Sequence, residues 1–277
     1  MLYNFKDILD LGEQGGFAVP AFNIYNLEEA VGVMKAAEET GAPVIFQMFN
    51  RLFDSGPGRY LAPAILEMIK TLKTPAAFHL DHGVGEPPIL RAFRYGATGV
   101  MIDASTFDYR ENVERTKRIV ELAKEVDVSV EGELGHVGSA KDEKWADYTE
   151  TEGAVRFVEE TGVDALAIMV GTAHGHYKKA PVLAIDRIAE IHAATKAHLV
   201  LHGGSGVPDE QIRQAIRAGI RKINFATDIN CAYLEGFRRV DCDTMPIDIL
   251  LSYPTDDVKN VAIEKIKLLG ANKYGAK

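Results

Sequence analysis

Residues 98–133 read TGVMIDASTFDYRENVERTKRIVELAKEVDVSVEGE, and this stretch decides the fold. Its two ends, 98–104 and 128–133, are short runs rich in β-branched or apolar residues, as expected of buried strands. Between them, residues 111–126 place apolar side chains three and four positions apart, the spacing that gives a helix one apolar face. The stretch is therefore predicted to be a strand–helix–strand unit, the building block of a parallel sheet.

The same alternation extends over the rest of the 277-residue chain, with helical spacing again at 27–40 and 208–218. The strand candidates are 17–24, 43–49, 76–81, 98–104, 128–133, 164–171, 198–202 and 221–226. Eight alternating units in a chain of this length predict an α/β fold, a single (β/α)8 TIM barrel that occupies 1–277 as one domain. A doubly wound open sheet fits less well, because the first strand–helix junction lacks a GxGxxG loop.

Charge and composition narrow the classes of partner. The formal net charge is −9, and lysine and arginine are scattered rather than gathered into a basic stripe with interleaved aromatic residues. This pattern argues against nucleic acid as a partner. No stretch approaches the roughly 18 apolar residues of a membrane span, so we expect no membrane association. The first residues lack a basic region followed by an apolar core, and we therefore expect a cytoplasmic location.

Polar residues and glycines gather at the C-terminal ends of the predicted strands. In a TIM barrel these ends meet at one mouth, where His82, His174 and His202 would face one another. Three neutral imidazoles with a fourth position open are a common catalytic zinc site. Taken singly, each histidine is better explained as a buried or capping residue. As a set at corresponding strand ends, they predict one zinc ion per subunit.

Carboxylates lie beside these histidines in the sequence. His79 and Asp81 should share one face of their strand, whereas His82 lies where the strand gives way to the loop. His79 is expected in the core or behind the ligands, and Asp81 either anchors loop backbone or transfers a proton. Asp103 and Glu133 end neighbouring strands, and three roles stay open for them: orienting the histidines, binding a second cation, or joining a buried hydrogen-bond network.

Two segments with small and hydroxyl residues follow the seventh and eighth strands, Gly203-Gly204-Ser205-Gly206 and Ala226-Thr227-Asp228. Glycine lets backbone N–H groups approach an oxyanion, and the Ser205 and Thr227 hydroxyls add donors. TIM barrels often bind phosphate at these two loops. Each segment alone would fit a tight turn or a helix cap, but the pair favours a phosphate site.

Residues 136–152 form a longer and more polar connection than the others, and we predict a mobile loop over the site. Its Asp142 and Glu143 could supply a base, although most loop carboxylates are only solvated. The tail after residue 229 is predicted to be helical, with turns near Pro246 and Pro254.

Seven ordered segments carry a family resemblance. They are PAFNIYNLE (20–28), HLDHG (79–83), VMIDAS (100–105), VEGELGHVG (130–138), GTAHGHYK (171–178), LVLHGGSGVPDE (199–210) and KINFATDIN (222–230). With these segments, the chain from about Phe17 to Phe237 resembles the zinc-dependent class II ketose-bisphosphate aldolases, and most closely their tagatose- and fructose-bisphosphate branch.

The resemblance implies a carbon–carbon lyase, an aldehyde-lyase of carbohydrate metabolism. The reaction would be reversible aldol cleavage of a ketose phosphate or 1,6-bisphosphate to dihydroxyacetone phosphate and an aldehyde such as glyceraldehyde 3-phosphate. It also implies zinc at His82, His174 and His202, and proton transfer by Asp81. The positions implied to surround the substrate are Asn23, Gly175, Lys178, Gly203, Gly204, Ser205, Asn224, Ala226, Thr227 and Asp228.

Asp103 and Glu133 match family positions that support the zinc ligands or bind a second cation. The following loop departs from the family pattern, because Lys141 stands where the family has a glutamate that exchanges the enediolate proton. Asp142 or Glu143 would have to replace that glutamate.

Phe49 is a second departure, since many relatives have serine or threonine there, near a phosphate. Two other functions stay open: a zinc barrel hydrolase of another phosphorylated compound and, because of Lys141, a non-catalytic subunit that binds sugar phosphates. In each case the expected partner is a small sugar phosphate, and a homo-oligomer, dimer or tetramer, is expected.

Overall fold

The computed structural model describes residues 1–54, 56–139, 148–177, 179–241 and 243–275. Eight parallel strands form a closed barrel in sequence order, β1 pairing with β8 to complete the ring. The strands are β1 (Val19–Asn23), β2 (Val44–Phe49), β3 (Ala76–Gly83), β4 (Gly99–Ile102), β5 (Ser129–Leu134), β6 (Ala165–Ile168), β7 (His198–Leu201) and β8 (Ile220–Phe225). The predicted (β/α)8 TIM barrel is confirmed, and every predicted strand range contains or overlaps an observed strand.

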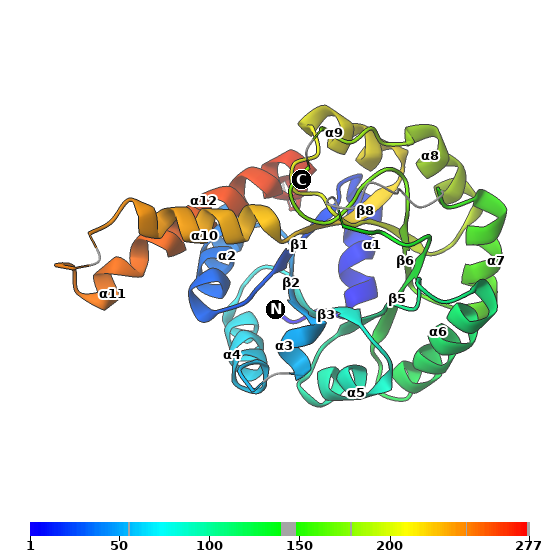
Figure 1. Cartoon of the computed structure of the whole chain (residues 1–277), viewed down its shortest axis with the longest axis horizontal. Helices are drawn as coiled ribbons and strands as arrows, with labels where there is room; N and C mark the ends of the chain where they lie inside the picture. Colours follow the sequence, from blue (N-terminus) through cyan, green and yellow to red (C-terminus); the bar gives the residue numbers. More distant parts are fainter. Residues whose placement is uncertain (55, 140–147, 178, 242, 276–277) are drawn as a thin grey trace.

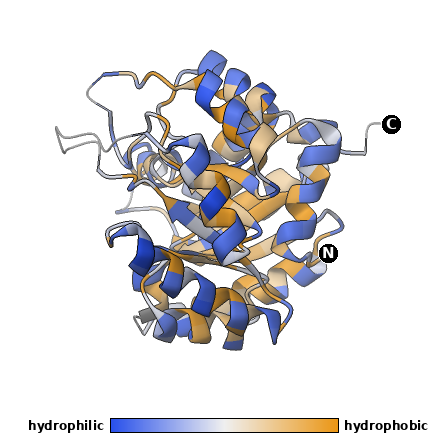
Figure 2. Ribbon diagram, turned by 90° about the vertical axis from the view of Figure 1, so that its right-hand side faces the viewer, coloured by the Kyte–Doolittle hydropathy of each residue, from blue (hydrophilic) through white to orange (hydrophobic). Residues whose placement is uncertain are grey.

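Helices surround the ring of strands, as Figure 1 shows. They are α1 (Phe5–Gly15), α2 (Leu27–Thr40), α3 (Asn50–Asp54), α4 (Gly58–Thr71), α5 (Glu86–Arg94), α6 (Tyr109–Lys124), α7 (Thr151–Thr161), α8 (Ile185–Ala194), α9 (Asp209–Ala218), α10 (Thr227–Arg238), α11 (Ile247–Leu250) and α12 (Ser252–Leu269), followed by a 3-10 turn at Ala271–Lys273. Hydrophobic residues concentrate in the strands and on the helix faces that cover them (Figure 2). No helix in these described segments has the length and apolar character needed to cross a bilayer.

The interior of the barrel is polar toward its mouth. Glu131 on β5 accepts a bond from the Lys222 ammonium on β8 at 2.8 Å, and both side chains are fully buried. Because β5 and β8 are not neighbours in the ring, this ion pair must cross the barrel interior. Asp81 on β3 likewise bonds to Asn224 on β8. The strands therefore direct polar side chains inward, where they meet.

The opposite end of the barrel is closed by α1. The centroids of the Phe5 and His79 rings lie 4.5 Å apart, and a side chain at Gly99 would meet Phe5 Cβ at 2.4 Å. The chain ahead of α1 continues along the start of β3, where Leu2 pairs with Ala76. The His79 imidazole is thus buried between this helix and the polar interior.

β6 ends earlier than the predicted 164–171. After Ile168 the backbone of Met169 bonds to Thr149 instead of to a neighbouring strand: Thr149 N donates to Met169 O, and Met169 N donates to the Thr149 hydroxyl, both at 2.9 Å. The strand therefore ends at Ile168, and the next residue is bonded to the segment that leads into α7.

The helical tail is confirmed, with α10, α11 and α12 projecting to one side of the barrel in Figure 1. Pro246 precedes α11 as predicted, and a turn at Leu251 separates α11 from α12 shortly before Pro254. Pro254 lies in the first turn of α12, where a missing N–H costs no helical hydrogen bond.

Candidate active site

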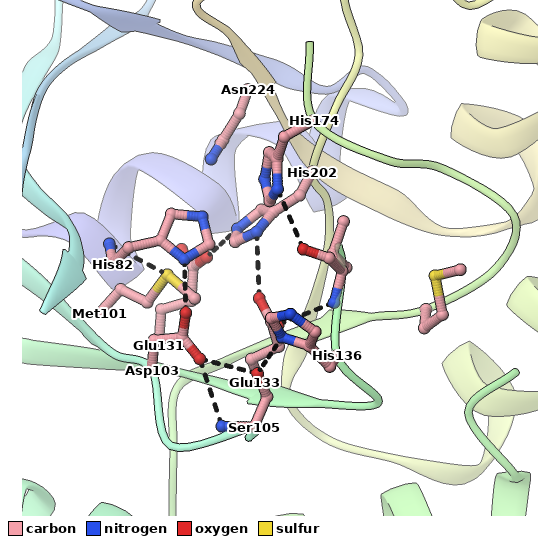
Figure 3. Close-up of polar contacts among 12 residues, drawn as sticks. His82, Met101, Asp103, Ser105, Glu131, Glu133, His136, His174, His202 and Asn224 are labelled. Atoms are coloured by element: carbon pink, nitrogen blue, oxygen red, sulfur yellow. Dashed lines mark hydrogen bonds and ion pairs between the residues drawn. The ribbon is translucent and has the colours of Figure 1, made fainter. Parts of the chain in front are cut away.

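Three imidazoles face one another at the barrel mouth (Figure 3). His82 comes from the end of β3, His174 from the segment after β6, and His202 from the residue after β7. Their ring centroids are 4.8 to 5.6 Å apart. One ligand atom from each lies within 4.8 Å of the other two, a separation that a single metal ion can bridge. The structure thus brings together the residues that the sequence predicted as metal ligands.

The backbone at His82 explains how adjacent residues both reach the mouth. In a regular strand, Asp81 and His82 would point to opposite faces. His82 has φ +50°, and the pairing of β3 with β4 shifts register between Leu80 and Gly83. A non-glycine residue with positive φ is strained, and such residues concentrate at functional sites. This irregularity turns the His82 imidazole inward beside the Asp81 carboxylate.

Each imidazole has a partner that fixes its tautomer. His82 Nδ1 lies 2.7 Å from Asp103 Oδ2, His174 Nδ1 lies 3.0 Å from the Val137 carbonyl, and His202 Nε2 lies 2.8 Å from Glu131 Oε1. Because carbonyl and carboxylate oxygens accept, these nitrogens carry the protons. The opposite nitrogens, Nε2 of His82 and His174 and Nδ1 of His202, are left as the electron-pair donors.

These donors fit a metal ion. His174 Nε2 and His202 Nδ1 are buried without a hydrogen-bond partner, which is costly unless another group completes the site. Glu133 Oε2 lies 3.2 Å from His202 Nδ1 and also lacks a hydrogen bond. A second group, His82 with Asp103 and Glu133, is close enough to hold an ion. However, Asp103 already bonds to His82 and to the Ser105 hydroxyl at 2.8 Å, which favours the three-histidine set.

The electrostatic surroundings favour a cation. Burial lowers the pKa of His202, but the adjacent Glu131 and Glu133 outweigh it and raise the pKa to about 10. Burial, with His82 and His202 as neighbouring cations, lowers the pKa of His174 to about 4, so His174 is neutral at pH 7. A place that stabilises a proton so strongly on one imidazole will also stabilise a metal ion that replaces the proton.

Glu131 was not among the residues predicted from the sequence. It orients His202 through one oxygen and pairs with Lys222 through the other. Two-residue alternation on β5 could have found it, because Glu133 and Glu131 must point to the same side of the strand. His79 Nε2 lies 3.5 Å from Glu131, behind the ligands, which is one of the two places expected for His79.

Asp81 is held by two side-chain amides. The Asn23 amide donates to Oδ2 at 2.7 Å, and the Asn224 amide donates to Oδ1 at 3.2 Å. Asn23 is itself fixed by Gln47, which donates to its oxygen at 2.8 Å. Burial raises the pKa of Asp81, but the imidazoles of His82 and His202 outweigh it and leave the pKa below its usual value. Asp81 is therefore an oriented carboxylate next to the histidine cluster.

The histidines open into a cavity of about 210 Å³, large enough for a small metabolite. Of the predicted substrate positions, those that line it are Asn23, Gly175, Gly203, Ser205, Asn224, Ala226 and Thr227. Gly204 is packed between strands instead, because its N–H donates to Asn224 O and a side chain there would meet Ile223 at 2.4 Å. The Asp228 carboxylate pairs with Lys265 at 2.6 Å, while its N–H donates to the Ser205 hydroxyl.

Tyr177, which the sequence did not suggest, joins two of the loops. Its hydroxyl accepts from Ala173 N at 2.8 Å and donates to Gly203 O at 2.9 Å. Burial raises the pKa of Tyr177 to about 12, so the hydroxyl keeps the proton that it donates. The segment after β6 and the glycine segment after β7 are thereby fixed to each other.

Four further lining residues were not predicted as site residues: Tyr25, Phe49, Arg51 and Asn230. Tyr25 follows β1, Phe49 ends β2, Arg51 lies in α3 and Asn230 lies in α10. Apart from the departure at Phe49, nothing in their spacing marked them. Asp142, Glu143 and Lys178 lie outside the described residues, as do residues 140–147 of the loop predicted to be mobile.

The comparisons with known proteins agree with this geometry. Residues 3–274 match the family model described as fructose-bisphosphate aldolase class-II. A sulfofructosephosphate aldolase of Alkalicoccus urumqiensis is 35% identical over 267 residues, 95% of this chain and 93% of that protein. The crystal structure of the YdjI aldolase from Escherichia coli K12 is 32% identical with a TM-score of 0.90 over 98% of both chains.

A Campylobacter jejuni fructose-bisphosphate aldolase is 21% identical, with a TM-score of 0.84 over 99% of this chain and 97% of that one, and it supports the fold alone. Fold, site and comparisons together define a TIM-barrel lyase. The chain belongs to the class II fructose-bisphosphate aldolase family, metal-dependent enzymes that cleave ketose phosphates by aldol chemistry. The resemblance seen in the sequence is thereby confirmed, and neither the hydrolase nor the non-catalytic subunit is supported.

Proposed function

We propose that the protein binds one zinc ion through His82, His174 and His202 and reversibly cleaves a ketose phosphate to dihydroxyacetone phosphate and an aldehyde. The observation that carries the proposal is the shared orientation of the three imidazoles. Asp103, Val137 O and Glu131 each hold one nitrogen of a ring, which leaves the opposite nitrogen of each imidazole to a metal ion that would displace any proton there. Three nitrogens with an open fourth position suit zinc that has to accept a substrate oxygen.

When bound there, zinc would act as a Lewis acid that stabilises negative charge on the ketone oxygen. The protein's own residues handle the proton and the position of the substrate. Asp81 takes the proton from the hydroxyl on the carbon that becomes the aldehyde. The carbon–carbon bond then breaks, and its electron pair moves toward the ketone. In the reverse direction, Asp81 returns the proton to the new hydroxyl.

The dihydroxyacetone phosphate half would lie with its phosphate against Gly175, Gly203, Ser205 and Thr227. Gly203 has φ +64°, and a side chain there would meet Ala173 O at 2.2 Å, so only glycine fits. Thr227 begins α10, and the free N–H groups and dipole of a helix start favour an anion. The enediolate left by cleavage must then gain a proton, for which Asp142 and Glu143 are the candidate acids.

A panel of ketose phosphates would test this function. Purified protein loaded with zinc should release dihydroxyacetone phosphate from at least one ketose phosphate, lose activity on chelation and regain it with zinc. The panel should include fructose and tagatose 1,6-bisphosphates and, because one relative is named a sulfofructosephosphate aldolase, sulfofructose phosphate.

His174→Ala is the sharpest variant, because among the described residues the hydrogen bond of its ring is to a backbone carbonyl and to no other side chain. It should abolish both zinc retention and cleavage, whereas His176→Ala, at an exposed histidine two residues on, should change neither. Turnover that survives complete metal removal would disprove the zinc role. Release of inorganic phosphate without triose phosphate would replace the aldolase with a hydrolase.

A further inference from the structure

The active-site cavity contains a cation that the reaction at the histidines does not use. Among the described residues that line the cavity, Arg51 is the one lysine or arginine. It lies in α3, two residues after the end of β2. The glycine and hydroxyl donors of Gly203, Ser205 and Thr227 follow β7 and β8 instead. One cavity therefore holds two separate groups of donors to an anion.

Aromatic rings hold the Arg51 guanidinium in place. Its central carbon lies 5.1 Å from the centroid of the Tyr25 ring and 5.1 Å from that of Phe49. In the part of the chain that the structure describes, no carboxylate forms an ion pair with Arg51. Arg115, which also stacks on a ring, is by contrast paired with Glu111. The charge of Arg51 is thus positioned without being neutralised.

Phe49 connects this cation to the histidine cluster. Its ring centroid is 5.7 Å from that of His82, and Arg51 covers the same ring. A substrate whose reacting carbon lies against the imidazoles would pass over Phe49 to bring its far end to the guanidinium. The Phe49 ring itself has no hydrogen-bond donor for that end, whereas the neighbouring Arg51 has.

The neighbouring groups are neutral donors. Burial, together with the nearby Asp81 charge, raises the pKa of Tyr25 above its usual value, so its hydroxyl stays protonated at neutral pH. Tyr25 also bonds to Asn230 in α10, and both line the cavity. The Tyr25 hydroxyl and the Asn230 amide are hydrogen-bonding groups that suit an oxyanion held by the guanidinium.

We propose that Arg51 binds the anionic group, phosphate or sulfonate, at the far end of the aldehyde half of the substrate. This inference rests on the proposed aldol function and adds a requirement to it, namely that the aldehyde is anionic. A guanidinium presents paired N–H donors that match two oxygens of a tetrahedral oxyanion, and such charge-assisted bonds are among the strongest in proteins.

The test measures condensation of dihydroxyacetone phosphate with three aldehydes of equal chain length, using the zinc-loaded protein. They are glyceraldehyde, glyceraldehyde 3-phosphate and 3-sulfolactaldehyde. Wild type should favour an anionic aldehyde over glyceraldehyde in kcat/KM. Arg51→Gln should lower that ratio by about 10- to 100-fold, mostly through KM of the anionic aldehyde, the loss expected for a charge-assisted pair.

Arg51→Lys should recover part of the ratio, since it restores the charge without the paired donors. Arg59→Gln is the matched control: Arg59 is also exposed and stacks on a ring, that of Tyr60, but it does not line the cavity. The ratio of kcat/KM for an anionic aldehyde to kcat/KM for glyceraldehyde should equal that of wild type in this variant. The anionic aldehyde whose kcat/KM falls more in Arg51→Gln carries the group, phosphate or sulfonate, that Arg51 binds.

Two results would overturn the inference while leaving the aldolase intact. Unchanged kcat/KM for every aldehyde in Arg51→Gln would show that the cation does not contact the aldehyde. An equal loss with all three aldehydes would show that Arg51 only supports the loop. Wild-type protein that condenses none of the aldehydes and cleaves no ketose phosphate would instead disprove the proposed function, and this inference with it.

Discussion

At the scale of single residues, the three imidazoles depend on side chains that stand behind them. Asp103 is the simplest to test, because its carboxylate holds His82 Nδ1 and lies outside the buried Glu131–Lys222 pair. Asp103→Asn should weaken zinc binding by about 10-fold or more, the usual effect of replacing a group that orients a ligand. Competition with a chromophoric chelator would measure the affinity.

Asp108→Asn is the matched control. Asp108 caps α6 by accepting a bond from Glu111 N, and asparagine caps equally well. Zinc affinity should therefore equal that of wild type. If Asp103→Asn behaves like this control, Asp103 does not set the orientation of His82.

Glu29 gives stability a dependence on pH. Its side chain is 2% exposed, and burial raises the pKa to about 7 despite a bond from Tyr25 N. The folded state then holds the proton more strongly than the unfolded chain, whose value is near 4.5. The contribution of Glu29 is complete below pH 4.5 and is lost as pH rises through 7.

Glu29→Gln keeps an oxygen for Tyr25 N and removes the titration. It should be more stable than wild type at pH 8, by about 1–3 kcal/mol, and nearly equal to it at pH 4.5. Urea unfolding of metal-free protein at several pH values would measure the difference in free energy of unfolding between the two proteins. Glu38→Gln, at an exposed position of the same helix, should show no such change, and parallel curves for wild type and Glu29→Gln would refute the assignment.

Single residues also show where the sequence stops being informative. The three histidines could be predicted as a set because barrel topology alone brings strand ends together. The positive φ of His82 could not be predicted from the sequence, since it arises from the shifted pairing of β3 with β4. Arg51 and Tyr177 act through contacts between loops, which no local pattern records.

At the scale of elements, α12 is packed unusually close to its neighbours. A side chain at Gly32 of α2 would meet Val258 Cγ1 at 2.7 Å and Thr255 O at 2.8 Å. At Gly153 in α7, the described atom nearest to an added side chain is Leu134 Cδ2 at 3.8 Å, an ordinary contact. The same substitution in these two helices should therefore have opposite effects.

Gly32→Ala should lower the free energy of unfolding by about 1–3 kcal/mol, because the added methyl forces α2 and α12 apart. Gly153→Ala should raise it by about 0.5–1 kcal/mol, because alanine loses less backbone entropy in a helix. Urea denaturation of both variants would measure these changes in the free energy of unfolding. Stabilisation of similar size in both would mean that α2 and α12 are not in close contact.

Elements were predictable where periodicity was clear, and less so where tertiary bonds intervene. The range 27–40 predicted α2 to the residue, since its apolar spacing coincides with its caps. β6 was predicted too long because the Met169 backbone bonds to Thr149, a partner that lies far off in sequence. The break between α11 and α12 falls at Leu251 and not at Pro254 itself, because proline fits the first turn of a helix.

At the scale of the whole molecule, the metal should contribute to stability. A ligand that binds only the folded state stabilises it by an amount that grows with its free concentration, about 2.7 kcal/mol at 100 times Kd. The unfolding temperature of wild type should therefore rise with free zinc and fall on chelation. Differential scanning calorimetry across buffered zinc concentrations would measure the shift.

His174→Ala should unfold at a temperature that zinc does not change, while His176→Ala should follow wild type. An equal zinc-dependent rise in His174→Ala would place the stabilising metal elsewhere on the molecule. The net charge of −9 makes this control necessary, since weak surface binding of a divalent cation is common in acidic proteins.

The packing of the first residues along the start of β3 has a practical consequence. Met1 O accepts a bond from Ala76 N, and the Met1 side chain is half exposed at the end of the barrel remote from the histidines. A linker fused ahead of Met1 and anchored to a bead would hold the molecule by its base, with the mouth facing the flowing solution. Immobilised protein of this kind should exchange substrate and product freely, whereas attachment through lysines at random would orient many copies mouth-down.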